Sequence, residues 1–341
     1  MSETMQAVIC NAPHEIAVEA RPMPVPAPDE VLLRIVRAGI CGTDYHIYAG
    51  LHPFLSYPRL IGHELAGVVV SAPPGSGWQA GQLAVINPYV ACGACHACRL
   101  GLPNACMKIA VLGVHRDGGM AQYLALPARN LVPAGDLTPD QAGSVEFLAI
   151  GAHAVRRGAV RPGQRVLVVG AGPIGMGAAI FARIAGGDVT VADREADRLA
   201  LVQGATGGKV ILADAHLAQA VAAATGGDGF DAVFDATGNA PSMEASFAHV
   251  AHGGVLVLVG LNKGSVGFSD PEFHRREMSV MASRNATRVD FDTVMAAMLS
   301  GEVDVARLIT HRTTLARVAS DLPHWAGHKA GLIKAMVEIG A

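Results

Sequence analysis

An apolar strand that runs directly into a glycine-rich turn is the feature that most constrains how this chain of 341 residues can fold. Residues 165–169 read RVLVV, and the next six residues read GAGPIG, which has the spacing G-x-G-x-x-G. The first glycine allows a tight turn, the second lets a ligand approach the backbone, and the third allows a helix to pack closely on the strand. Free N–H groups at the start of that helix attract anions. We therefore predict a dinucleotide pyrophosphate site formed by Gly170, Gly172, Pro173, Ile174 and Gly175.

An acidic residue follows this turn at the distance that a dinucleotide site needs. Asp193 ends the next predicted strand, residues 188–193. A carboxylate there accepts hydrogen bonds from the ribose hydroxyls and repels a 2′-phosphate, so the sequence favours NAD over NADP. Arg194 is a counter-signal, because an arginine can accommodate that phosphate; we count Arg194 and Arg198 among the expected cofactor contacts. The alternative is a structural glycine turn beside a surface aspartate.

The rest of the chain divides into two patterns. After about residue 150, short apolar runs alternate with helical stretches, which is typical of a doubly wound parallel α/β sheet. The residues before about 150 predict a β-rich domain, and the chain ends in a predicted helix and strand. The expected strands and helix are 6–10, 31–36, 68–70, 83–86, 165–169, 188–193, 209–212, 231–235, 255–259, 291–299 (helix) and 332–337. We predict a discontinuous domain of residues 1–147 and 283–341 around a nucleotide-binding domain of residues 148–282.

Four of the six cysteines lie in one short segment, with the spacing C-x2-C-x2-C-x7-C. Four thiolates so placed suit a closed structural zinc site. An iron–sulfur cluster also uses four cysteines, so the spacing alone leaves that alternative open. The N-terminus has no secretory pattern, so we expect a cytoplasmic protein with metal-bound thiols and not a disulfide framework. These ligands are Cys92, Cys95, Cys98 and Cys106; Cys10 has no predicted role.

Composition excludes two kinds of partner. The net charge is −3 and no run of basic residues stands out, so the sequence does not indicate a nucleic-acid binder. The longest weakly polar stretch, residues 166–182, is too short for a membrane span and is broken by glycines, so no membrane span is expected. Apolar residues make up 51% of the chain, enough for a large core. We expect a small molecule as the partner.

A second group of metal-binding residue types stands apart from the four-cysteine segment. Residues 41–46 read CGTDYH and residues 62–64 read GHE. A thiolate, an imidazole and a carboxylate held together would form a zinc site with an open position. At this point the chain resembles the zinc-containing medium-chain alcohol/polyol dehydrogenases over essentially its whole length. It is most similar to the sorbitol dehydrogenase-like branch, and within it to bacterial starvation-sensing dehydrogenase-like proteins and L-gulonate/L-galactonate 5-dehydrogenases. The segments that carry this likeness are 38–41, 46–48, 57–59, 111–115, 117–119 and 308–311.

The resemblance implies a Rossmann domain joined to a β-rich, GroES-like catalytic domain with a structural zinc lobe. It also implies two zinc ions per chain and NAD. Cys41 and His63 match the family's catalytic zinc ligands, and Glu146 matches the third ligand of the polyol branch. Phe147 departs from the proline that is usual after that glutamate. Glu64 matches a carboxylate that binds zinc directly or through water.

The resemblance also implies the residues around the metal. Asp44 would orient His63, Thr43 would pass on the substrate proton, and His46 would carry it to solvent, although His46 also fits a plain surface histidine. Substrate contacts are expected from Arg284 and its neighbour Asn285. His115 and Arg116 match pocket-wall positions, for which a surface role is an equal alternative.

These implications lead to one predicted reaction and several alternatives. We predict a zinc- and NAD-dependent oxidation at C5 of a sugar acid such as L-gulonate or L-galactonate. The alternatives are a sorbitol- or threonine-dehydrogenase-like enzyme for polyols or secondary alcohols, and a non-catalytic NAD- and zinc-binding regulator. A zinc-lacking quinone or enoyl reductase is disfavoured by the two metal-ligand groups. A homodimer or homotetramer is expected, with residues 255–268 at its interface edge.

Overall fold

The computed structural model describes residues 3–53, 55–328 and 331–340. The chain forms two compact units: unit 1 comprises Met1–Glu146 and Met295–Ala341, and unit 2 comprises Phe147–Val294. The chain therefore enters unit 2 within helix α3 (Pro139–Arg157) and leaves it within α9 (Arg288–Leu299). Residues 283–294, which the sequence analysis assigns to the discontinuous domain, lie in unit 2. The reason is that Asp290 of α9 bonds to α3 residues of the same unit.

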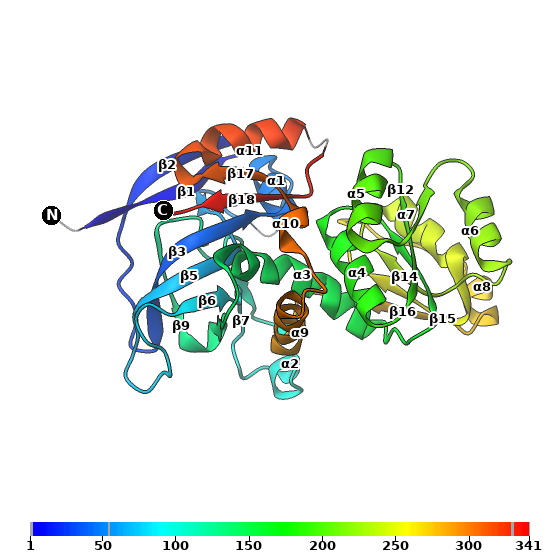
Figure 1. The fold of residues 1–341 in the computed structure, drawn as a ribbon, viewed down its shortest axis with the longest axis horizontal. Helices are drawn as coiled ribbons and strands as arrows, with labels where there is room; N and C mark the ends of the chain where they lie inside the picture. The colour runs from blue at the N-terminus through cyan, green and yellow to red at the C-terminus, as the bar shows by residue number, and fades with distance from the viewer. Residues whose placement is uncertain (1–2, 54, 329–330, 341) are drawn as a thin grey trace. The chain divides into compact units, whose positions relative to one another are not determined.

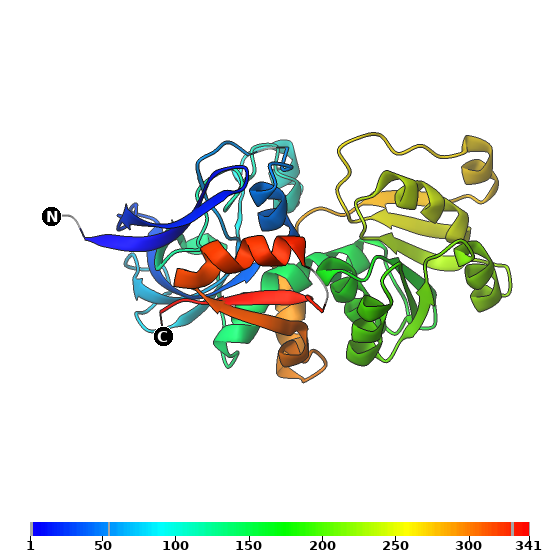
Figure 2. The same cartoon turned by 90° about the horizontal axis from the view of Figure 1, so that it is seen from above.

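Unit 2 is built on one parallel sheet of six strands, in the order β13-β12-β11-β14-β15-β16. Its central strand, β11, is apolar along its length because both faces of such a sheet are covered. Helices cover both faces (Figure 2). The predicted doubly wound fold is thus confirmed. The strands are β11 (Arg165–Val169), β12 (Asp188–Asp193), β13 (Lys209–Leu212), β14 (Phe230–Asp235), β15 (Val250–Leu258) and β16 (Ser279–Ala282).

The helices of unit 2 begin and end at residues that suit caps. Gly172 is the N-cap of α4 and Pro173 follows at its first position, where a missing N–H costs nothing. Asn239 caps α7 by accepting the N–H of Ser242 at 3.2 Å. Gly207 ends α5 in the left-handed conformation. The helices that lie wholly within unit 2 are α4 (Pro173–Ile184), α5 (Ala196–Thr206), α6 (Leu217–Thr225), α7 (Ala240–Ser246), η3 (Phe247–His249) and α8 (Asp270–Arg275).

Residues 255–268, predicted at the interface edge, do not form an edge of this sheet. The strand within residues 255–268 is β15, and it pairs with β14 on one side and β16 on the other. A strand hydrogen-bonded on both sides has no free backbone edge to offer. The edge strands among the described residues are β13 and β16. Val280 of β16 is 40% exposed, so the apolar edge lies further along the chain than predicted.

Unit 1 is β-rich, as predicted. A seven-stranded sheet has the order β10-β6-β5-β3-β18-β17, with β9 also paired to β3, and a three-stranded sheet has the order β2-β1-β4 (Figure 1). The last strand of the chain, β18, pairs antiparallel with β3, so the C-terminal segment completes the N-terminal sheet. The strands are β1 (Thr4–Ala12), β2 (Glu15–Pro22), β3 (Glu30–Ile40), β4 (Arg59–Leu60), β5 (Glu64–Ser71), β6 (Leu83–Ile86), β7 (Tyr89–Val90), β8 (Ala110–Val111), β9 (Tyr123–Pro127), β10 (Leu131–Pro133), β17 (Ile309–Thr314) and β18 (Lys334–Glu338).

Short helices complete unit 1, and one apolar core holds it together. Leu33 and Ile35 of β3 and Val337 of β18 are fully buried in this core with residues of α11. Among the described residues, no helix combines the length and the apolar character needed to cross a bilayer. The helices are α1 (Gly42–Tyr48), α2 (His96–Arg99), η1 (Pro103–Ala105), η2 (Ala128–Asn130), α10 (Val305–Leu308), η4 (Leu315–Arg317) and α11 (Val318–Gly327).

Candidate metal centres and nucleotide site

Two neighbouring strands bring the first group of metal-binding residues together. Strand β3 ends at Ile40, so Cys41 follows it as the N-cap of α1. Strand β5 begins at Glu64, directly after His63, and Glu64 lies opposite Gly39 of β3. Antiparallel pairing therefore places the end of one strand beside the start of the other. Sequence segments that are far apart meet at this point.

The meeting point is a compact donor set. One donor atom from each of Cys41, His63 and Glu64 lies within 4.8 Å of the others. His63 is 5% exposed and Glu64 is fully buried. A half-buried thiol beside a buried imidazole and a buried carboxylate, this close together, supplies the donor types of a zinc site. The nearby Cys41 and Asp44 raise the pKa of His63 well above its ordinary value, although burial by itself lowers it.

Asp44 lies where an orienting carboxylate is expected. Its Oδ2 accepts the backbone N–H of Cys41 at 2.9 Å, and its Oδ1 lies 3.9 Å from Nδ1 of His63. Both Oδ1 and Nδ1 are buried and have no hydrogen-bond partner among the described residues. Buried polar atoms normally have partners. A metal bound on the other ring nitrogen would fix a proton on Nδ1, facing Asp44, so the residues present fit a zinc ion.

A buried lysine holds Glu64. Nζ of Lys334 donates to both carboxylate oxygens, at 2.6 and 2.7 Å, and both side chains are at most 1% exposed. Gly39 makes room for this carboxylate, because a Cβ there would lie 2.0 Å from Oε2 of Glu64. Glu64 is thus charge-paired at the same place where its oxygen approaches Cys41 and His63.

A tyrosine holds Glu146. This glutamate lies on α3, is 5% exposed, and its Oε1 accepts a hydrogen bond from the Tyr89 hydroxyl. Burial, and the neighbouring charge of Glu64, raise the pKa of Glu146 to about 7. The structure does not place a Glu146 oxygen within the 4.8 Å group formed by Cys41, His63 and Glu64. The bond from Tyr89 uses Oε1, and the second oxygen, Oε2, is of a donor type that can bind a metal.

The expected proton-transfer residues share helix α1. Thr43 is half-buried, whereas His46, one turn later, is exposed. The two residues that match pocket-wall positions lie close together. His115 is exposed and accepts the N–H of Val111 on Nδ1 at 3.2 Å. Arg116 is half-buried and lines a cavity of about 610 Å³ together with Arg21 and Arg59. The described wall of that cavity includes none of the metal donors.

The expected substrate-contact pair lies in unit 2, in the turn between β16 and α9. Asn285 has a φ of 54°, in the left-handed region that few residues other than glycine adopt. Asparagine adopts this region more readily than most other non-glycine residues. Arg284 precedes Asn285, and the next residue, Ala286, is buried.

The four-cysteine lobe gathers its thiols around one point. One sulfur atom from each cysteine lies within 4.8 Å of the others, with Sγ of Cys95 3.5 Å from Cys98 and 3.8 Å from Cys106. Backbone N–H groups point at these sulfurs: Lys108 donates to Cys106 at 3.3 Å and Met107 to Cys95 at 3.5 Å. Such donors stabilise thiolates, and the backbone N–H groups of Cys98 and Met107 lower the pKa of Cys95 to about 6. The lobe can therefore bind a structural zinc.

The glycine-rich turn has the geometry that its sequence predicts. Gly170 has a φ of 99°, and a Cβ on Gly175 would lie 1.8 Å from the carbonyl oxygen of Gly170. A Cβ on Gly172 would meet no atom within 4 Å, so the space above the turn is open to a pyrophosphate. Asp193 braces the turn, because its Oδ2 accepts the N–H of Ala171 at 2.6 Å. Arg194 is exposed and Arg198 is half-buried.

Two family models and a curated relative match this chain. Residues 27–136 match the model of the alcohol dehydrogenase GroES-like domain, and residues 173–300 match that of the zinc-binding dehydrogenases. The chain is 43% identical to the L-galactonate-5-dehydrogenase of Escherichia coli K12 over 338 residues, which cover 98% of this chain and 99% of the relative.

Solved structures give the same result. The short chain alcohol dehydrogenase RspB of E. coli CFT073, in complex with NADH, is 28% identical, with a TM-score of 0.92 over 98% of this chain and 99% of that one. A putative zinc-binding dehydrogenase of Sinorhizobium meliloti 1021, bound to NADP, is 28% identical, with a TM-score of 0.89 over 99% of this chain and 100% of that one.

These matches define a class of oxidoreductase that uses zinc and a nicotinamide dinucleotide. The chain belongs to the zinc-type medium-chain alcohol dehydrogenase family, with its GroES-like and Rossmann domains. The predicted fold class, enzyme class and cofactor types are thereby confirmed.

Sequence reasoning missed two residues of the first metal centre. Lys334 had a signal, because it is a single charge within the otherwise apolar segment LIKAMV at residues 332–337. A charge in an apolar strand calls for a buried partner. Tyr89 had no signal, because its position before the cysteine lobe gives no hint of Glu146, which lies 57 residues away.

Proposed function

We propose that this protein oxidises the C5 hydroxyl of a sugar acid of the L-galactonate or L-gulonate type, with NAD as the hydride acceptor. The observation that carries the proposal is a compact thiol–imidazole–carboxylate set in a chain that is 43% identical, along its length, to an L-galactonate-5-dehydrogenase. Uncharged polyols and secondary alcohols are the neighbouring substrates.

The catalytic zinc ligands are, in this proposal, Cys41, His63 and Glu146. Two carboxylates compete for the third position. Lys334 holds both oxygens of Glu64, so part of the negative charge of Glu64 is already neutralised. Tyr89 donates to Oε1 of Glu146, and Oε2 is the oxygen that would bind the ion. Glu64 then lies next to the ion as a carboxylate that does not bind it directly. Four cysteines hold the second, structural zinc: Cys92, Cys95, Cys98 and Cys106.

The bound groups supply Lewis-acid polarisation of the substrate hydroxyl and a hydride acceptor. The residues of the chain handle the proton. Thr43, half-buried on α1, accepts the hydrogen bond of the reacting hydroxyl, and exposed His46 on the same helix passes the proton to water. Asp44 keeps His63 in the orientation that metal binding needs.

Arg284 is the residue that selects an acid over a neutral sugar in this proposal, because a guanidinium pairs with a carboxylate through two parallel hydrogen bonds. Asn285 would contact the sugar hydroxyls. His115 and Arg116 are not needed for recognition of the substrate in this proposal. His115 is exposed, and Arg116 lines a cavity whose described wall includes none of the metal donors.

The nucleotide preference follows from Asp193, whose carboxylate lies at the turn that receives the dinucleotide. We further propose a homodimer or homotetramer and a cytoplasmic location. The exposed edge strand β16 supports the proposed oligomer. Four metal-binding thiols, which need a reducing compartment, support the cytoplasmic location.

The proposal is tested by purifying the zinc-loaded protein and measuring initial rates with L-galactonate, L-gulonate, sorbitol and L-threonine, each with NAD and with NADP. The formation of reduced nicotinamide is followed. We expect the highest kcat/KM for one of the two sugar acids with NAD. Rates confined to sorbitol or L-threonine would refute the sugar-acid assignment while leaving the enzyme class intact.

A further inference from the structure

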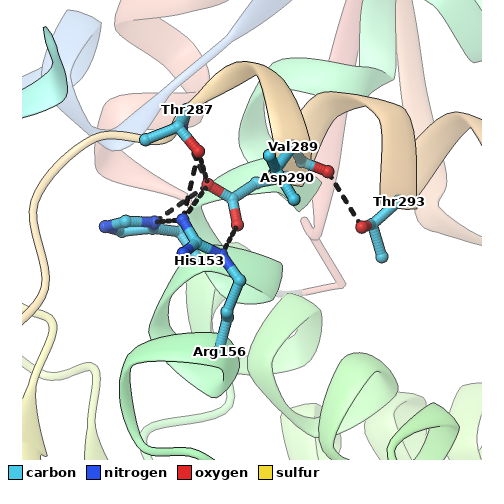
Figure 3. A network of polar contacts seen from close by, with 6 residues as sticks. All are labelled: His153, Arg156, Thr287, Val289, Asp290 and Thr293. Carbon is cyan, nitrogen blue, oxygen red and sulfur yellow. Dashed lines mark hydrogen bonds and ion pairs between the residues drawn. The ribbon is translucent and has the colours of Figure 1, made fainter. Parts of the chain in front are cut away.

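A buried carboxylate outside the metal centre collects an unusual number of hydrogen bonds. Asp290, on the first turn of α9, is 1% exposed. Its two oxygens accept bonds from three residues: His153, Arg156 and Thr287 (Figure 3). Burial alone raises the pKa of Asp290, but these bonds hold the pKa below its ordinary value. The group is therefore a carboxylate anion in the folded protein.

Two of these partners come from helix α3. Nδ1 of His153 lies 2.9 Å from Oδ2 of Asp290, and Arg156 donates Nε to Oδ1 at 2.7 Å and a terminal nitrogen to Oδ2 at 3.0 Å. The arginine contact is bidentate, which fixes direction as well as charge. His153 is 2% exposed, whereas the side chain of Arg156 is 48% exposed.

The third partner ends the turn that carries the expected substrate contacts. Thr287 donates its backbone N–H to Oδ2 of Asp290 at 2.8 Å and its hydroxyl to the same oxygen at 2.7 Å. The same hydroxyl accepts a bond from Arg156 at 3.1 Å. Thr287 follows Arg284 and Asn285 closely, and Asn285 holds a left-handed conformation.

Helix capping accounts for one of these bonds, from the N–H of Thr287 to the carboxylate three residues later, but not for the bonds from α3. A cap needs one acceptor for the N–H groups of the first turn and is usually at the surface. Here the acceptor is buried and is also bound by a cationic side chain from another helix. Asp290 and Thr287 tie the turn before α9 to α3.

We propose that Asp290 and Thr287 are positioning residues for the substrate. Their hydrogen bonds to His153 and Arg156 of α3 fix the turn of residues 283–287, and with it Arg284. This inference rests on the proposed function, because it takes Arg284 as the group that recognises the substrate carboxylate. The positioning residues act through that arginine and touch no reacting atom.

The test removes one hydroxyl and leaves the shape of the residue. Thr287→Val loses the bonds of the hydroxyl, and Thr287→Ser keeps them. Thr293→Val is the matched control, because the Thr293 hydroxyl also lies on α9 but donates only to the Val289 carbonyl of its own helix, at 2.9 Å (Figure 3). Asp290→Asn is a stronger variant that removes the charge.

Two readouts separate positioning from a general loss of structure. For Thr287→Val we expect the KM for the sugar acid to rise about tenfold, as the loss of a hydrogen bond to a charged group allows, with kcat and the NAD affinity unchanged. The KM for sorbitol should not change, because a neutral substrate does not need the arginine. Amide hydrogen exchange within residues 283–287 should become roughly fivefold faster. Thr287→Ser and Thr293→Val should behave like the unmodified protein.

An equal rise in KM for the acid and the neutral substrate, or unchanged exchange in the turn, would overturn the inference. If the unmodified protein turns over no sugar acid at all, the proposed function fails instead. In that case unchanged exchange still refutes the fixing of the turn, so the two failures remain distinct.

Discussion

Nζ of Lys334, on the last strand of the chain, lies 2.6 and 2.7 Å from the two carboxylate oxygens of Glu64, which precedes it by 270 residues. Both side chains are buried beside the metal donors. Removing the lysine leaves a buried charge without its partner. We expect Lys334→Met to lower the free energy of unfolding by about 3–5 kcal/mol, measured by denaturant titration.

The matched double variant decides whether the pair acts as a unit. Glu64→Met combined with Lys334→Met replaces both charges by apolar groups, which is often nearly neutral for stability. The double variant should therefore be more stable than Lys334→Met alone. If the two single losses simply add, the ion pair is not what stabilises this part of unit 1.

Tyr89→Phe tests how Glu146 is held. The variant removes one hydroxyl and with it the hydrogen bond to Oε1 of Glu146. Groups that orient a metal ligand typically contribute 10–100-fold to metal affinity, so we expect a loss of roughly tenfold or more in zinc affinity at one of two sites. Competition with a chromogenic chelator measures it. Tyr123→Phe, on β9 of the same unit, is the control; equal zinc affinity in both variants would contradict the role of Tyr89.

The cofactor preference can be tested at the end of β12. Asp193→Asn removes the charge but keeps an oxygen that can accept the N–H of Ala171. We expect the ratio of kcat/KM for NAD over NADP to fall roughly tenfold or more, because repulsion of the 2′-phosphate is lost. Asp188→Asn, at the exposed start of the same strand, should leave the ratio unchanged. If Asp193→Asn left the ratio of kcat/KM for NAD over NADP unchanged, Asp193 would not be the residue that sets the preference for NAD.

Asp290 should make stability depend on pH in a defined direction. Its pKa in the folded protein is below the ordinary value, which is about 3.9 in an unfolded chain. Its stabilisation is therefore fully present above about pH 4 and is lost as the pH falls further. The unfolding free energy of the unmodified protein should exceed that of Asp290→Asn by roughly 3–5 kcal/mol at neutral pH. The gap should narrow below about pH 4; a gap independent of pH would contradict an ionised Asp290.

The features that the sequence predicted well are local ones. The four cysteines lie between residues 92 and 106, and the glycine turn, its strand and its helix are continuous in sequence. Steric demands at such places select residue types directly: Gly175 is required because a Cβ would lie 1.8 Å from a carbonyl oxygen. Patterns of this kind can be read without knowing the fold.

The features that the sequence did not predict depend on long-range contacts. Asp290 meets His153 across 137 residues, and Lys334 meets Glu64 across 270. The sheet edge was misplaced for a similar reason, since the addition of β16 beside β15 depends on how the chain returns after α8. Burial and pairing of this kind arise only when the sheet is assembled.

The central claim is that hydride leaves C5 of a sugar acid for the nicotinamide. Zinc-loaded protein incubated with NAD and L-galactonate carrying deuterium at C5 tests it most directly, with mass spectrometry of both products. We predict that the deuterium appears on the reduced nicotinamide and is absent from the keto acid. Retention of the deuterium in the oxidised sugar acid, or no reduced nicotinamide at all, would contradict the claim.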